Sequence, residues 1–200
     1  ESQSLLMGCK CHEVYDAIEA IGSPIRKSSP WAYHTQFTQS INTYFERSGY
    51  GWKLEDGQIV SRGEEAFELA VSAAAAALAA HKSHATAASE LHEAIADLSR
   101  RPDPDLTGAI SHSIAALECV AREYCDDPQP TCGKLLERHP NMLPRPLGDG
   151  VEKAWAYASE RGRHLREGRN PTREEAELIV GISAAVATYL VRKKRATKPT

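Results

Sequence analysis

The sequence predicts an all-α protein: an antiparallel helical bundle preceded by an N-terminal helical segment that carries one short β-hairpin. Three observations predict this fold. Apolar residues recur at helical spacing along most of the chain, alanine is abundant while aromatic residues make up only 6%, and one Asp-Gly pair separates two short strand-like runs. A chain of 200 residues is long enough for one or two small domains.

Composition excludes several classes of protein. With 42% hydrophobic and 26% charged residues, the chain is not collagen-like, wholly disordered or a disulfide-dense miniprotein. No run approaches the roughly 18 apolar residues that a membrane span needs, and no signal peptide is visible, so we expect a cytoplasmic protein without a membrane partner. The chain begins at Glu1 rather than at methionine, which leaves an upstream domain open.

Cysteine and charge give weaker signals. Five cysteines, an odd number, indicate reduced thiols. Cys9, Cys11 and His12 could supply three metal ligands, but no second pair has zinc spacing, so we expect no metal and no cofactor. Residues 151–200 hold eleven Lys and Arg against six acids, a charge of +5, which leaves −8 on the first 150 residues. This basic end fits either an anionic partner or a solvated helix face with a loose tail.

The first predicted helix carries Val14 and Ile18 at helical spacing and should end at Gly22-Ser23-Pro24, because glycine and proline interrupt helices. A second helix should run from Pro30 to about Gly49.

The hairpin is predicted at about residues 52–61. Trp52–Glu55 and Gln58–Ser61 flank Asp56-Gly57, a pair suited to a type I′ turn because both central residues need positive φ. An isolated two-stranded ribbon is marginal in water, so this hairpin should pack on helices.

Two more helices, from Glu64 and from about Thr86, should complete the N-terminal segment of residues 1–101. Arg101-Pro102-Asp103-Pro104 then predicts a domain boundary. The bundle is expected at 105–195, with a basic tail at 196–200. Its four predicted helices run from Leu106 to about Cys125, from Thr131 to Arg138, from after Pro146 to about Arg166, and from Thr172, where Thr172 and Glu175 form a capping box.

A polar cluster near the end of the third bundle helix is the candidate site. Glu160, Arg161 and His164 share one face of a helix, with Arg163 nearby. Imidazole can move a proton at neutral pH and arginine can neutralise charge on a phosphate, so the cluster suits phosphodiester chemistry. The alternative interpretation is an exposed last helical turn whose cations favour the helix dipole.

Glu118 is a second candidate, because it lies among apolar residues of the helix 106–125. A carboxylate in such a place needs a cation or hydrogen-bond donors. We expect it to be buried and paired with Arg161 or Arg163.

Several stretches together resemble a known family: residues 106–122, Gly133–Leu136, Leu143–Leu147, Trp155–Ala158 and Gly162–His164. In this order they are similar to the abortive-infection (Abi) C-terminal type of HEPN domain, over about residues 105–195. The resemblance implies a bundle of four to five helices that forms a homodimer. In active members an Arg and a His on one helix cleave RNA without metal.

The sequence departs from the family's signature, because no Arg precedes His164 at the family's spacing of four to six residues. The expected catalytic residues are therefore His164, Arg161 and Arg163, with Glu118 and Glu160 in support. The first hypothesis is a bacterial defence effector that cleaves or binds RNA without metal. The second is a non-catalytic, dimerising module that binds another protein or belongs to a larger polypeptide.

Overall fold

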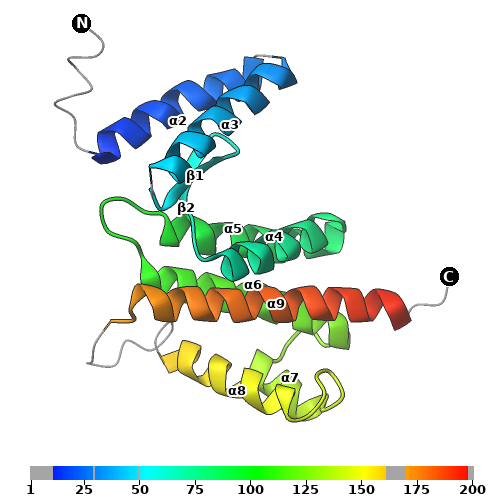
Figure 1. Ribbon diagram of the computed structural model, residues 1–200. Helices are drawn as coiled ribbons and strands as arrows, with labels where there is room; N and C mark the ends of the chain where they lie inside the picture. The colour runs from blue at the N-terminus through cyan, green and yellow to red at the C-terminus, as the bar shows by residue number, and fades with distance from the viewer. Residues whose placement is uncertain (1–10, 29, 49, 161–169, 198–200) are drawn as a thin grey trace, which may run out of the picture. The chain divides into compact units, whose positions relative to one another are not determined.

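The computed structural model describes residues 11–28, 30–48, 50–160 and 170–197 (Figure 1). Well over half of the chain is helical and the strands form one two-stranded sheet within these residues, so the all-α prediction with a single hairpin is confirmed. The chain divides into two compact units. Unit 1 comprises residues 1–63 and 99–104, and unit 2 comprises residues 64–98 and 105–200.

Unit 1 contains two helices and the hairpin: α2 (Cys11–Ser28), α3 (Trp31–Arg47), β1 (Trp52–Glu55) and β2 (Gln58–Ser61). The strands pair antiparallel, with Leu54 opposite Ile59. Asp56 and Gly57 have φ values of 49° and 84°, as the predicted type I′ turn requires. The hairpin packs on the helices as expected, through a small core of Tyr15, Phe45, Leu54 and Ile59.

The predicted end of the first helix at Gly22-Ser23-Pro24 is wrong, because α2 continues through Pro24 to Ser28. A Cβ on Gly22 would lie 3.3 Å from Cε1 of Phe37 and 3.7 Å from Cα of Gly57. The glycine therefore allows close approach to α3 and to the hairpin turn, and packing outweighs its poor helix propensity. Pro24 removes its own N–H from the helical ladder, and its ring crowds the carbonyl four residues earlier, but the helix continues past it.

Side chains of both helices satisfy the backbone of the hairpin. Asn42 Nδ2 donates to the Leu54 carbonyl at 3.0 Å, and the Leu54 N–H donates to Asn42 Oδ1 at 2.6 Å. On the other strand, the Ile59 N–H donates to Glu19 Oε1 at 2.7 Å. These bonds pair edge groups that a two-stranded sheet would otherwise leave to solvent.

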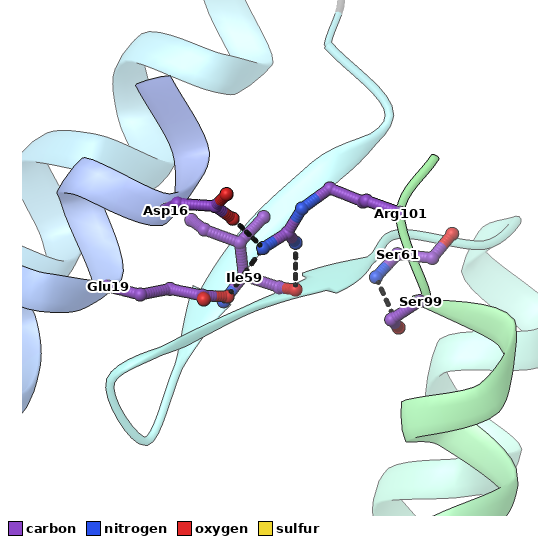
Figure 2. A network of polar contacts seen from close by, with 6 residues as sticks. All are labelled: Asp16, Glu19, Ile59, Ser61, Ser99 and Arg101. Atoms are coloured by element: carbon purple, nitrogen blue, oxygen red, sulfur yellow. Dashed lines mark hydrogen bonds and ion pairs between the residues drawn. The ribbon is translucent and has the colours of Figure 1, made fainter. Parts of the chain in front are cut away.

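Arg101 joins residues 99–104 to unit 1 (Figure 2). Its Nη2 donates to Asp16 Oδ1 and to Glu19 Oε1, both at 3.0 Å, and its Nη1 donates to the Ile59 carbonyl at 3.0 Å. The guanidinium also lies 5.6 Å from the ring centroid of Tyr15, within cation–π range.

The division between the units therefore differs from the predicted boundary at 101–104. The chain leaves unit 1 after Gly63, forms two helices of unit 2, and returns to unit 1 at Ser99, whose hydroxyl accepts from the Ser61 N–H at 2.8 Å (Figure 2). Two prolines predict a linker here, but the arginine beside them has partners far away in the sequence. Because those partners lie in unit 1, the stretch is part of that unit rather than a free connection.

Unit 2 is a helical bundle, and its elements are α4 (Glu65–Ala79), the 3₁₀ turn η1 (Lys82–His84), α5 (Ala85–Leu98), α6 (Leu106–Cys125), α7 (Cys132–Arg138), α8 (Leu147–Ala158) and α9 (Arg173–Thr197). In Figure 1, α4, α5, α6 and α9 lie side by side, and α7 and α8 run along one flank. Fully buried alanines such as Ala74, Ala109, Ala121 and Ala176 allow these helices to approach closely.

Neighbouring helices α4, α5 and α6 alternate in direction, whereas α9 runs parallel to α6 (Figure 1). Lys194, near the end of α9, donates to the Glu123 carbonyl near the end of α6. The chain returns to the start of the bundle through α7 and α8 before α9 begins (Figure 1). Because this long connection returns the chain to the end of the bundle where α6 begins, α9 can run parallel to α6.

The predicted capping box begins α9. The Thr172 N–H donates to Glu175 Oε2 at 2.8 Å, and the Glu175 N–H donates to Thr172 Oγ1 at 3.3 Å. The helix predicted after Pro146 is confirmed as α8 to Ala158, and its predicted continuation to Arg166 runs into residues outside those described. Across the described residues, no helix has both the length and the apolar character that a bilayer crossing demands.

Replacing Arg101 with alanine should destabilise unit 1 by roughly 1–3 kcal/mol, because three charged hydrogen bonds are lost while the carboxylates keep some access to water. Hydrogen exchange read by mass spectrometry should show faster exchange in peptides covering 52–61. Peptides of α6 and α9 should be unchanged. Arg47→Ala, at an exposed position of α3 in the same unit, is the matched control, and equal exchange in both variants would contradict this role of Arg101.

Candidate functional site

Glu118 is buried in unit 2, with 3% of its surface exposed, so the predicted burial is confirmed. Its Oε1 accepts from the Cys132 N–H and from Trp155 Nε1, both at 3.3 Å. Its Oε2 accepts from Arg122 Nη2 at 3.2 Å, one turn along α6. This carboxylate therefore joins α6 to the first turn of α7 and to the last turn of α8.

Two features hold the donors of Glu118 in place. Arg122 Nε donates to the Pro130 carbonyl at 2.8 Å, which ties the guanidinium to the loop before α7. Gly133 lies against the Trp155 indole, because a Cβ there would come within 2.9 Å of the ring. A side chain at position 133 would displace the indole from the carboxylate, so glycine is required for this contact.

The thiol beside Glu118 is unsuited to nucleophilic chemistry. Burial, together with the charge of Glu118, raises the pKa of Cys132 to about 12. The thiolate, which is the reactive form, is therefore nearly absent at neutral pH. The chemical role of this cluster is to hold α8, not to attack a substrate.

The other predicted site residues lie near or beyond the end of α8. Glu160 is exposed. Arg161, Arg163 and His164 lie outside the described residues, as do the side chains proposed as metal ligands near the N-terminus (Cys9, Cys11 and His12). The expected pairing of Glu118 with Arg161 or Arg163 remains a prediction, and the cation that the structure describes beside it is Arg122.

A second polar cluster, which the sequence analysis missed, lies in unit 2 at the ends of α6 and α9. Glu123 of α6 accepts from Nδ1 of His84 at 2.7 Å and from the Ser83 hydroxyl at 3.1 Å. These side chains line a cleft of about 120 Å³, which we call the α6–α9 cleft. Its lining residues are His81, Ser83, His84, Glu123, Val191, Lys194 and Arg195.

Burial lowers the pKa of His84 below its ordinary value of 6.5, and nearby His81, Arg195 and Lys194 act in the same direction against the opposing charge of Glu123. The imidazole is therefore neutral at neutral pH. The sequence signal that could have found this cluster is the pair of histidines in His81-Lys-Ser-His84, which a 3₁₀ turn brings to one side. Glu123, far along the chain, carries no such signal.

A third ion cluster joins α5 to α6. His112 Nδ1 lies 2.8 Å from Glu90 Oε2, and Nε2 lies 3.7 Å from Asp97 Oδ2. The hydrogen bond to Glu90, aided by the charges of Glu90, Asp97 and Glu93 and opposed by partial burial, raises the pKa of His112 above 6.5. The His112 side chain is 40% exposed and is ion-paired.

Comparison with known proteins finds a match for the first part of the chain. Residues 1–77 match the family model AbiJ N-terminal domain 4. The AbiJ match covers unit 1 up to Gly63 together with most of α4. No curated protein and no solved structure matches the chain.

The AbiJ match ends before residues 99–104, which the structure assigns to unit 1. A domain delimited at residue 77 would therefore lack Arg101 and its bonds to α2 and β2.

The ion pairs of His112 should make its contribution to stability depend on pH. Because its folded pKa lies above the unfolded value of about 6.5, the contribution is complete below that value and is lost as pH rises through the folded pKa. His112→Gln should therefore lower the Tm more at about pH 6 than at about pH 9. Calorimetry of the variant and the parent at both pH values measures this difference.

His92→Gln, at an exposed position of α5, is the matched control and should leave the Tm nearly unchanged at both pH values. A deficit for His112→Gln that grows as pH rises would show that the ion pairs do not act as described.

Proposed function

We propose that this is an abortive-infection defence protein whose helical unit 2 acts on RNA, at a site formed by His164 with Arg161 and Arg163. The AbiJ match to residues 1–77 supports the defence role. The resemblance of residues 105–195 to HEPN domains and the basic character of the last fifty residues support RNA as the partner. The proposed chemistry is metal-independent cleavage.

In this mechanism the His164 imidazole removes the proton from a ribose 2′-hydroxyl, and that oxygen attacks the adjacent phosphorus. Arg161 and Arg163 offset the charge that develops on the phosphate oxygens. The 5′-oxygen leaves with a proton, so the products are a 2′,3′-cyclic phosphate and a free 5′-hydroxyl. DNA lacks the attacking hydroxyl and should survive.

The observation that carries the proposal is the buried carboxylate beneath α8. Glu118 accepts from Trp155, which precedes Arg161 on the chain by less than two helical turns. A catalytic group must be held in a fixed geometry to be effective. The Glu118 carboxylate is 3% exposed and forms hydrogen bonds that join α6, α7 and α8, so it makes this part of the bundle rigid. Glu118 is therefore a positioning residue in this proposal.

The second candidate function is a dimerising module without catalysis, and an apolar stripe on α9 favours it. Leu178, Ile182, Ala185 and Tyr189 recur at helical spacing, with Leu178 62% and Tyr189 37% exposed. An exposed apolar stripe of this kind is typical of a surface that another helix covers. Dimerisation would also be compatible with the RNA-cleaving function.

His164→Ala should abolish cleavage of mixed RNA in the presence of EDTA, because removal of one acid–base group typically costs about 10²–10⁴ in rate. Wild type should cleave the same RNA and leave DNA intact. His92→Ala, at an exposed position of α5, is the matched control and should cleave like wild type.

Equal cleavage by His164→Ala and wild type would exclude His164 as the catalyst. Salt-dependent RNA binding without cleavage by wild type would favour a binding module instead. Neither cleavage nor binding would leave the dimerising module as the function.

The stripe on α9 should mediate a symmetric homodimer, since closed two-fold pairs are the commonest oligomers. Leu178→Glu should convert the dimer to a 21.9 kDa monomer in light scattering, because it buries a charge in an apolar contact. Leu147→Glu, at a position of α8 that is 50% exposed, is the matched control and should remain dimeric. A wild-type protein that is monomeric at tens of micromolar would contradict the dimer.

A further inference from the structure

The α6–α9 cleft contains a histidine held in one orientation and one tautomer. Glu123 is an acceptor, so the His84 Nδ1 atom 2.7 Å away carries a hydrogen and donates it. His84 is 7% exposed and neutral at neutral pH, so its other ring nitrogen, Nε2, is an acceptor. Among the described residues, the one polar side-chain contact of His84 is made by Nδ1, so Nε2 makes no hydrogen bond there.

The same cleft holds a cation that is available for a ligand. Lys194 is occupied, because its Nζ donates to the Glu123 carbonyl and to Asp126 Oδ1 at 3.0 Å, where it neutralises the end of α6. Arg195 is exposed and makes no ion pair within the described part of the chain. Its one protein contact there is a bond of 3.5 Å to the Ala77 carbonyl.

These two groups define what the cleft can recognise. A guanidinium binds phosphate oxygens, and a neutral imidazole nitrogen accepts from a hydroxyl. A ligand that uses both groups presents an oxyanion, such as a phosphate, beside a hydroxyl. The volume of the cleft, about 120 Å³, is below the roughly 300–1,000 Å³ of a pocket that encloses a whole small molecule. The cleft therefore binds one end of a larger ligand.

We propose that the α6–α9 cleft binds a phosphorylated ribose, with Arg195 holding the phosphate and Nε2 of His84 accepting from the neighbouring hydroxyl. A ribonucleotide 3′-phosphate, free or at the end of an RNA chain, has this arrangement in its 3′-phosphate and 2′-hydroxyl. Glu123 positions the imidazole and does not touch the ligand. The cleft is built from described residues of unit 2, and its ligand binding does not depend on cleavage at His164.

Calorimetric titration of the full chain with adenosine 3′-monophosphate tests the proposal, with 2′-deoxyadenosine 3′-monophosphate and adenosine as matched ligands. The ribonucleotide should bind. Loss of the hydroxyl should weaken binding several-fold, and loss of the phosphate should abolish it. This comparison probes His84 without a substitution at a buried position.

The matched pair of variants is Arg195→Gln and Arg192→Gln. Both remove one charge from exposed positions of α9, and only the first lies among the residues lining the cleft. Arg195→Gln should weaken binding about tenfold or more, the usual effect of losing a charged hydrogen bond. Arg192→Gln should bind like wild type, and so should His164→Ala, which separates this cleft from the proposed cleavage site.

An oligoribonucleotide with a 3′-phosphate distinguishes the source of the ligand. Tighter binding of this oligonucleotide than of the mononucleotide assigns the cleft to RNA ends, and equal binding assigns it to free nucleotides. The proposal is overturned if the mononucleotide and the oligonucleotide both fail to bind at millimolar concentration. It is also overturned if the deoxy ligand binds equally well, or if Arg195→Gln and Arg192→Gln bind alike.

Discussion

A carboxylate that is 3% exposed must have donors, and the donors of Glu118 organise the flank of unit 2. The Cys132 N–H, which opens α7, and the Trp155 indole of α8 both reach the same oxygen. If either helix shifted, this carboxylate would lose a bond in a place that water cannot readily reach. The placement of α7 and α8 against α6 therefore depends on one acidic residue of α6.

Arg101 has the corresponding role in unit 1. A hairpin of four-residue strands and two helices forms a small core, and a small core stabilises a unit weakly. Residues 99–104 add three charged hydrogen bonds and a cation–π contact to it. Because they return from the end of α5, the AbiJ-matched stretch of residues 1–77 is not a self-contained unit.

His84 and His112 of unit 2 each have a carboxylate partner, and their pKa values shift in opposite directions. The hydrogen bond to Glu90, together with the charges of nearby acids, favours the charged form of His112, so this ring serves stability. Burial beside cations favours the neutral form of His84, so it can accept a proton or a hydrogen bond from a ligand. The two pKa values shift in opposite directions because burial is the strongest influence on His84, whereas the hydrogen bond to Glu90 is the strongest influence on His112.

The sequence by itself determined the features that depend on neighbouring residues: helical periodicity, the Asp56-Gly57 turn, the capping box at Thr172, and the burial of Glu118 among apolar residues of its own helix. Positive φ and end-capping are local preferences, so they can be predicted locally. The tertiary structure decided which distant groups meet, such as Glu123 with His84, Arg101 with Asp16, and Gly22 with the hairpin turn. The site proposed at His164 remains a sequence prediction. A buried polar group takes whichever donor the packing brings within about 3 Å, and residue spacing along the chain does not encode that packing.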